Sequence, residues 1–294
     1  MHYLDPVSLA KLRNLRLDLR RRVMEGHWAG RHRSSLRGFA SEFAQHRAYV
    51  PGDELRRLDW KVYARKDRFF VREYQEEKSL RAQVLLDASG SMSFSGQGRP
   101  SKWDYACRLS AALAYLVLSE GDAAGLAVFD SQERLFLPPR GGWPQIDVID
   151  RALADLRPGG ETDLVSVLRR TALRLPRRSL VMLISDLLGD PQEFLSLVKA
   201  LRARRQEVFV LQVLDPDERD LPYEGPALFE GLEDSALLRC EVSLVRAGYQ
   251  ELFEKRRRLY EASLHACGVR FGVFYTDRPW DAALTRYLSG ASVC

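Results

Sequence analysis

Cysteine is scarce in this 294-residue sequence, which has only four, at positions 107, 240, 267 and 294. None belongs to a Cys-x-x-Cys pair, so the sequence indicates neither a disulfide framework nor a zinc site. Long apolar runs are missing too, because the longest candidate, residues 111–129, is interrupted by Glu120, Gly121 and Asp122. The amino terminus has the pattern of a charged helix and not that of a signal peptide. We therefore expect a cytoplasmic protein with no membrane insertion.

Familiar catalytic motifs are also absent, since the chain has no Walker loop, no nucleophile elbow and no Rossmann glycine pattern. Charge is unevenly placed: residues 1–86 hold 19 Lys and Arg against 11 Asp and Glu, a net charge of +8, whereas the whole chain carries +5. The densest basic cluster would attract nucleic acid or an acidic protein surface; it comprises Arg20, Arg21, Arg22, Arg31, Arg33 and Arg37. No zinc-finger, homeodomain-like or RNA-recognition motif accompanies it, so nucleic-acid binding is a lesser alternative.

Apolar runs alternate with helical patterns along most of the chain. Strands are expected near residues 82–87, 125–129, 134–137, 180–185, 208–214 and 269–275. Cap residues indicate helix starts at Asp5-Pro6, Ser101 and Asp190-Pro191, and these helices are expected to reach Val23, Ser119 and Arg204. This alternation predicts an α/β fold with a doubly wound, mostly parallel sheet covered on both faces.

A second pattern breaks that alternation. Residues 219–247 are rich in Asp, Pro and Gly, with a hairpin expected around Glu233-Asp234-Ser235, and a helix is expected to follow over residues 249–266. We interpret residues 219–247 as an insertion in a main domain of residues 79–294, preceded by an amino-terminal segment of residues 1–78.

Residues 84–93 read Val-Leu-Leu-Asp-Ala-Ser-Gly-Ser-Met-Ser, so a buried-strand pattern ends in Asp87 and hydroxyls follow at Ser89 and Ser91. Parallel sheets bind ligands beyond the carboxyl ends of their strands. One carboxylate and two hydroxyls do not fill the octahedral shell of Mg²⁺, so such a site would remain open to water, to other residues or to a partner's Asp or Glu. The alternative is that Asp87 caps a loop and the two serines are ordinary turn residues.

Two later loops carry related residues. Residues 158–164 read Pro-Gly-Gly-Glu-Thr-Asp-Leu and contain Thr162, and residues 180–187 form a second buried-strand pattern that ends at Asp186. Taken singly, Thr162 suits a helix cap and Asp186 a strand-end residue facing water. Taken with the first loop, they resemble the von Willebrand factor A-type domain and its metal-ion-dependent adhesion site. The resemblance implies that Mg²⁺ or Mn²⁺ binds at Asp87, Ser89, Ser91, Thr162 and Asp186, with Asp186 often acting through water.

Residues 38–77 resemble the bacterial domain-of-unknown-function family 58. The matching positions are Arg47, Tyr49, Pro51-Gly52-Asp53, Arg56, Asp59-Trp60 and Ala64-Arg65. Members of that family often occur beside MoxR-type AAA+ ATPases, which are thought to act in complex assembly or cofactor insertion. From the residues themselves, interleaved Arg, Asp and aromatic side chains indicate a polar network that fastens this segment to the main domain, with direct partner contact as the alternative. His46 lacks a second His or Cys at ligand spacing, so it is a weak metal or acid–base candidate.

The two resemblances together imply a non-enzymatic, Mg²⁺-dependent protein interaction module. Its implied partner is a protein that offers a carboxylate, either a MoxR-type ATPase or its client, in complex assembly or maturation. The alternative is a hydrolase or phosphotransferase that uses the metal as a Lewis acid. Aspartyl-phosphate enzymes generally place another acid two residues after the nucleophilic Asp, and Ser89 stands there in this chain.

Overall fold

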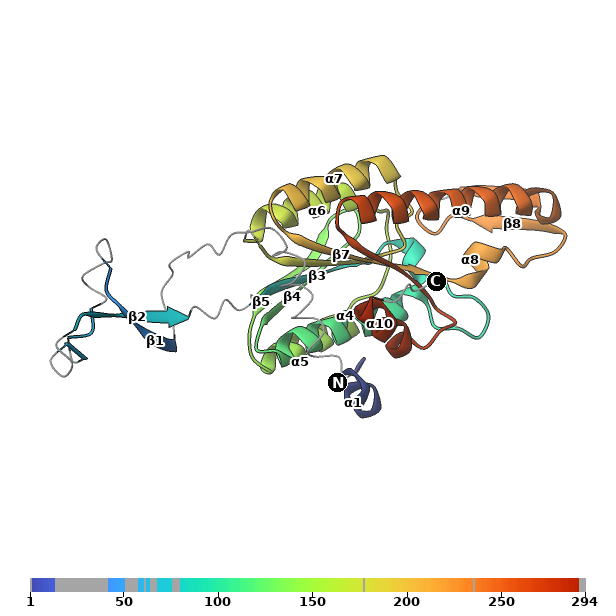
Figure 1. The fold of residues 1–294 in the computed structure, drawn as a ribbon. Coiled ribbons are helices and arrows are strands. Elements are labelled where there is room, and N and C mark those ends of the chain that lie inside the picture. The colour runs from blue at the N-terminus through green and yellow to red at the C-terminus, as the bar shows by residue number, and fades with distance from the viewer. Residues whose placement is uncertain are drawn as a thin grey trace. The chain divides into compact units, whose positions relative to one another are not determined.

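The computed structural model describes residues 2–13, 42–50, 58–60, 62–63, 68–75, 80–176, 178–234 and 236–290. The chain divides into two compact units, one of residues 1–27 with 80–294 and the other of residues 28–79 (Figure 1). The main unit thus resumes at Leu80, next to the predicted start of the main domain at residue 79. The segment predicted over residues 1–78 is divided between the two units, because the first helix belongs to the main one.

A six-stranded sheet forms the centre of the main unit, in the order β10-β7-β6-β3-β4-β5. Its strands are β3 (Arg81–Asp87), β4 (Ala123–Phe129), β5 (Glu133–Arg140), β6 (Leu180–Ser185), β7 (Glu207–Leu214) and β10 (Arg270–Tyr275). All neighbours pair in parallel except β4 and β5, which are antiparallel. Every predicted strand is present within a few residues of its expected bounds, and the predicted α/β fold with a mostly parallel sheet is confirmed.

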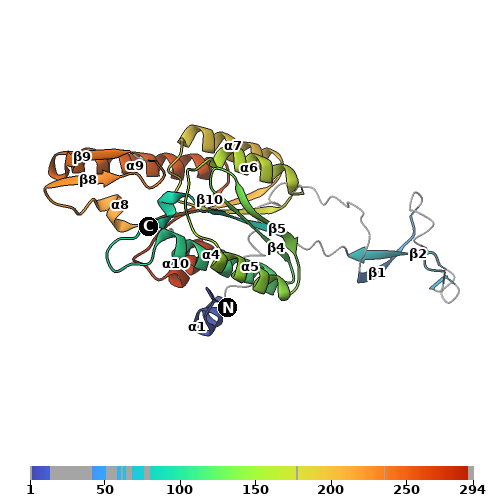
Figure 2. The ribbon, with the colours of Figure 1, turned by 180° about the vertical axis from the view of Figure 1, so that it is seen from behind.

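Helices cover both faces of this sheet (Figure 2). One face carries α4 (Lys102–Ser119), α5 (Pro144–Asp155) and α10 (Trp280–Ser289), with α1 (Pro6–Arg13) beside α4 and α10, and the other carries α6 (Leu164–Arg174), α7 (Pro191–Ala203) and α9 (Val242–Ala266). Side chains of strand β3 pack on both faces of the sheet: Val84 and Leu86 belong to one hydrophobic core and Leu85 to the other. Successive side chains of a strand point to opposite faces, so a strand buried on both sides is apolar throughout.

The predicted helix caps are present. The Ser101 hydroxyl accepts a hydrogen bond from the Asp104 backbone N–H at 3.0 Å, and the Asp190 carboxylate accepts one from the Gln192 N–H at 2.7 Å. Asp5 likewise accepts from the Ser8 N–H at 2.9 Å at the start of α1. Each bond satisfies a backbone donor that the first turn of a helix leaves unpaired. The continuation of the first helix to Val23 lies outside the described residues.

Helix α4 and strand β4 account for the longest apolar stretch of the sequence, since both are buried almost throughout. Among the helices in the described part of the chain, none combines the length and the apolar character needed to cross a membrane. Cys107, Cys240 and Cys267 are free thiols, and Cys294 lies outside the described residues.

The predicted insertion contains the short helix α8 (Pro216–Asp220) and a hairpin of β8 (Pro226–Glu230) and β9 (Leu237–Glu241). The hairpin is antiparallel and turns where the sequence predicted. The predicted start of the following helix at residue 249 was wrong, because α9 begins at Val242. Pairing of β9 ends at Glu241, and the next residue, Val242, is fully buried, so tertiary contacts set the start of α9. The apolar residues at positions 244 and 245 are exposed, so beyond Val242 the first turn of this helix has no buried apolar face that the sequence pattern could reveal.

The unit of residues 28–79 contains an antiparallel pair, β1 (Glu42–Ala48) and β2 (Phe70–Gln75). Asp59 belongs to a local network, since its N–H donates to the Phe70 carbonyl at 2.9 Å and its carboxylate accepts from the Val62 N–H at 3.2 Å. The rings of Tyr63 and Phe69 stack with centroids 4.4 Å apart. Residues 51–57 and 64–67 and the side chains of His46 and Arg47, which the sequence analysis singled out, lie outside the description.

Candidate metal centre

The carboxyl ends of β3 and β6 place two acidic residues side by side. Asp87 is the last residue of β3, Asp186 directly follows β6, and the two strands are parallel neighbours with Leu86 opposite Ile184. Asp87 is fully buried and Asp186 is 2% exposed. The alternative that Asp186 is a strand-end residue facing water was therefore wrong, because its side chain is buried against Lys102.

Asp87 is held by two hydrogen bonds. One carboxylate oxygen accepts from the Ser89 backbone N–H at 2.9 Å and the other from the Ser185 hydroxyl at 2.6 Å. Within the described ranges no Lys, Arg or His forms an ion pair with it. Burial, with the nearby charge of Asp186, raises the pKa of Asp87 to about 7, although the bonds from Ser185 and Ser89 favour the charged form. A buried carboxylate without a cation is costly, so this position favours a positive charge.

Ser89 and Ser91 complete the first loop. Ser89 is fully buried and Ser91 is 6% exposed, and their hydroxyl oxygens lie 3.1 Å apart. Two oxygen ligands at adjacent corners of an Mg²⁺ octahedron are about 3 Å apart, given metal–oxygen distances of about 2.1 Å. The spacing of the two hydroxyls therefore suits neighbouring ligands of one ion.

The second loop lies directly against the first. The Gly159 N–H donates to the Ala88 carbonyl and the Gly90 N–H donates to the Gly160 carbonyl, both at 2.8 Å. Gly160 has a φ of 87°, a backbone conformation that glycine adopts without strain. These bonds attach the glycine turn that precedes Thr162 to the Asp87 loop.

Thr162 is not the cap of the helix that follows it. The cap of α6 is Asp163, whose carboxylate accepts from the Ser166 N–H at 3.0 Å. The Thr162 hydroxyl instead bonds one oxygen of Glu233 at 3.2 Å, and its backbone N–H donates to the other oxygen, also at 3.2 Å. The cap interpretation of Thr162 was therefore wrong, and its hydroxyl is left facing the carboxylate of Glu233.

Lys102 is a residue of this site that sequence reasoning missed. Its side chain is fully buried, with Nζ 2.7 Å from an oxygen of Asp186 and 2.6 Å from an oxygen of Glu218. Burial lowers the pKa of Lys102, but the two carboxylates outweigh it and the pKa lies above its ordinary value. The sequence signal is weak: a lysine directly follows a capping serine at the start of a helix whose second half is largely apolar. Because Lys102 holds one oxygen of Asp186, that carboxylate is less available than Asp87 to a metal.

The turn after Asp186 is fixed from several sides. Leu187 has a φ of 58°, the left-handed region that costs a non-glycine residue about 1–3 kcal/mol. The Tyr260 hydroxyl donates to the Leu187 carbonyl at 3.1 Å, and the Gln212 side-chain amide donates to the Asp186 carbonyl at 2.9 Å. These contacts from α9 and β7 hold the backbone at Asp186 in place.

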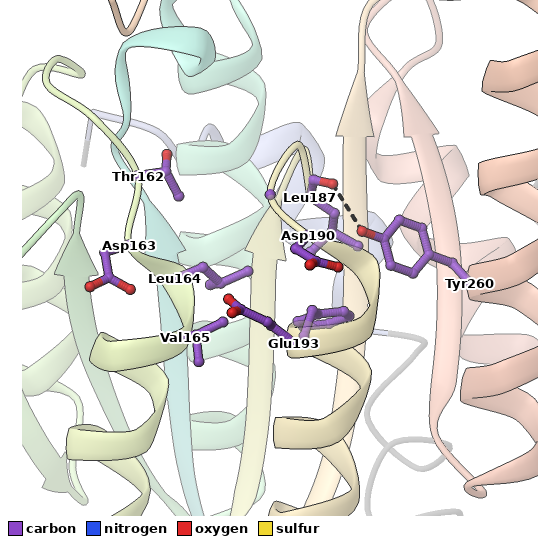
Figure 3. A pocket seen from close by; sticks show the side chains of 10 residues that line it. Thr162, Asp163, Leu164, Val165, Leu187, Asp190, Glu193 and Tyr260 are labelled. Atoms are coloured by element: carbon purple, nitrogen blue, oxygen red, sulfur yellow. Dashed lines mark hydrogen bonds between the residues drawn. The ribbon is translucent and has the colours of Figure 1, made fainter.

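A small hollow of about 110 Å³ lies beside Thr162, between the first turns of α6 and α7 (Figure 3). Its walls combine the carboxylates of Asp163, Asp190 and Glu193 with apolar side chains, including Leu187, Phe194 and Tyr260. Asp163 and Asp190 already cap helices, so this hollow adds an acidic surface next to the site and no further set of ligands.

The residues at this edge fit a hard divalent cation. Carboxylate and hydroxyl oxygens are the donors that Mg²⁺ and Mn²⁺ prefer. Nowhere in the described ranges do three or more His, Cys, Asp or Glu side chains gather in a metal-binding group, so a cation at this edge would depend on serine and threonine hydroxyls as well as on carboxylates. The full burial of Asp87 without a cationic partner is the observation that a bound cation would explain.

Comparison with known proteins identifies relatives over nearly the whole chain. The family described as "Protein of unknown function DUF58" matches residues 45–259. The uncharacterized protein Mb1516 of Mycobacterium bovis is 29% identical over 291 residues, which cover 97% of this chain and 90% of that protein. The uncharacterized protein YeaD of Bacillus subtilis is 29% identical over 97 residues, which cover 33% of this chain and 22% of that protein.

Solved structures with a similar arrangement include BatB from Bacteroides thetaiotaomicron, with a TM-score of 0.47 and 16% identity over 72% of this chain and 98% of that one. The VWA domain of SpRpn10 has a TM-score of 0.37 and 13% identity over 46% of this chain and 76% of that one.

Proposed function

This chain belongs to the DUF58 family, and we propose that it is a non-enzymatic module that binds other proteins through a Mg²⁺ or Mn²⁺ ion. Asp87, Ser89, Ser91 and Thr162 would hold the ion, with Asp186 acting directly or through water. The observation that carries this proposal is the Asp87 carboxylate, which is fully buried at the sheet edge without a cationic partner in the described ranges. A hard cation with so few charged ligands would still attract an anionic oxygen.

The partner follows from that chemistry. An ion held directly by one carboxylate, that of Asp87, and by several neutral hydroxyls would take an Asp or Glu side chain from another protein as a further ligand. Within this proposal the protein is a cytoplasmic adaptor for a MoxR-type AAA+ ATPase or its client, which is the partner that kinship implies. No described residue suggests a catalytic step at this site.

Binding to a purified MoxR-type ATPase tests the proposal. Association should be measurable in Mg²⁺, should be lost in excess chelator, and should be lost in the Asp87→Asn variant. Asp147→Asn is the matched control, because Asp147 is exposed in the first turn of α5 and forms no part of the site. Equal binding with chelator and with Mg²⁺ would refute metal dependence.

The effect of Mg²⁺ on thermal stability should depend on pH. In the metal-free protein the pKa of Asp87 is raised to about 7, so a proton competes with the metal below that pH. Because the folded protein raises the pKa of Asp87, protonated Asp87 stabilises the metal-free fold. This contribution to the free energy of unfolding is fully present below about pH 4, the pKa of an aspartate in the unfolded chain, and is lost as the pH rises to about 7. Mg²⁺ should therefore raise the melting temperature more at about pH 8 than at about pH 5.5.

Scanning calorimetry with and without Mg²⁺ across this range measures the effect, and Asp87→Asn should abolish both the shift and its pH dependence. A shift of the same size at every pH would show that deprotonation of Asp87 is not linked to metal binding.

A further inference from the structure

The tip of the β8–β9 hairpin reaches the candidate site from the inserted segment. Both carboxylate oxygens of Glu233 are bonded to Thr162, one to its hydroxyl and one to its backbone N–H, each at 3.2 Å. Glu233 is 71 residues away from Thr162 in the chain, so only the fold brings them together. An oxygen–oxygen distance near 3 Å is also that of two adjacent ligands on one Mg²⁺ ion.

A second contact places the same tip on the Asp87 loop. A Cβ atom built on Gly90 would lie 2.0 Å from the carbonyl oxygen of Leu232, which no side chain allows. Gly90 lies between Ser89 and Ser91, so the hairpin backbone sits directly on the segment that carries both hydroxyls. Glycine at this position is therefore needed for the tip to approach the site.

The rest of the hairpin is loosely covered. Leu228 is 51% exposed, and Leu237 and Leu238 are each 63% exposed. The base is anchored, because Arg246 donates to the carbonyls of Leu221 and Tyr223 and the Val242 N–H donates to the Gly225 carbonyl. Between this base and the tip the two strands pair with each other, so the hairpin has backbone contacts that do not depend on the tip.

From these contacts we infer that Glu233 is a further metal ligand of this site. Its carboxylate would occupy the same position on the ion as the carboxylate of a partner protein. The inference rests on the proposed function, because both carboxylates would compete for the same ion. The hairpin tip would then keep the site closed, and a partner would displace Glu233 in order to bind. The apolar side chains at positions 228, 237 and 238 stay exposed in the closed state.

Mn²⁺ binding by the full chain tests this inference, with Glu233→Gln as the variant and Glu230→Gln as the control. Glu230 is the exposed last residue of β8, three residues before Glu233. Calorimetry should show that Glu233→Gln weakens Mn²⁺ binding by about tenfold or more, the scale at which groups supporting a metal site act. The relaxation rate of water protons at bound Mn²⁺ should rise in this variant, because water enters the position that the carboxylate leaves.

Acetate serves as the competing carboxylate. It should lower the water relaxation rate of the Mn²⁺-loaded Glu233→Gln variant at concentrations that leave the wild type and Glu230→Gln unchanged. Gly90→Ala should open the site in the same way without removing a carboxylate, because the added methyl group displaces the tip.

The outcomes separate the two proposals. If the wild type binds Mn²⁺ and Glu233→Gln matches it in affinity, water relaxation and acetate response, the role of Glu233 is refuted while the metal site stands. If the wild type binds no Mn²⁺, the metal-dependent function and the role of Glu233 both fall.

Discussion

Replacing Asp87 with asparagine should abolish Mg²⁺ and Mn²⁺ binding while leaving the protein folded. The asparagine side chain would retain an oxygen to accept the Ser89 N–H and an amide group to meet Ser185, so the two bonds that hold this position have replacements. The negative charge would be gone, and we expect the affinity for Mn²⁺ to fall by more than about 100-fold, beyond the cost of changes that only support a metal site. Isothermal titration calorimetry of metal-free wild type and variant measures this loss.

The same substitution should not lower the stability of the metal-free protein. Asp87 is a buried carboxylate beside Asp186, and its raised pKa shows that its charged form is disfavoured in the fold. At a pH above 7, asparagine removes that cost, so the free energy of unfolding in chelator should equal or exceed that of the wild type. Urea titrations in chelator check this expectation. A large loss of stability in Asp87→Asn would mean that Asp87 is a structural residue and that the loss of metal binding says nothing of its role as a ligand.

Replacing Lys102 with methionine should lower the free energy of unfolding by about 3–5 kcal/mol, the cost of removing one partner from a buried ion pair. Lys102 is fully buried and is bonded to both Asp186 and Glu218, so its loss leaves two carboxylates without their cation. Methionine retains most of the apolar stem, which limits the loss of packing. Urea or thermal unfolding measures the change, and Lys199→Met, at an exposed position of α7, should stay within about 0.5 kcal/mol of the wild type.

Two further measurements show whether the lost charge is the cause. Adding Asp186→Asn and Glu218→Gln to Lys102→Met should recover part of the stability, because the unpaired carboxylates are then neutral. Mg²⁺ should stabilise Lys102→Met more than the wild type, because the ion would supply a cation next to Asp186. If Lys102→Met costs no more than Lys199→Met, the Lys102 ion pairs contribute nothing to the fold.

The strands and the arrangement of layers could be predicted from local patterns. Continuous apolar runs such as residues 180–185 mark strands buried on both faces, and the caps at Ser101 and Asp190 mark where helices begin. The start of α9 could not be predicted this way, because the end of β9 pairing and the burial of Val242 decide it. A local pattern contains no information about contacts made by the neighbouring element.

The sequence by itself determined the order of strands and helices, and its resemblance to the von Willebrand factor A-type domain implied the candidate ligands Asp87, Ser89, Ser91, Thr162 and Asp186. Parallel strands meet at one edge of a sheet, so a carboxylate that ends a buried run can be placed there without coordinates. Only the tertiary structure decided the charge of the site. It buried Asp186 against Lys102 and left Asp87 with no cationic partner in the described ranges. It also brought Glu233 to Thr162. These contacts join segments far apart in the chain, and burial and pairing of charges arise only once those segments pack together.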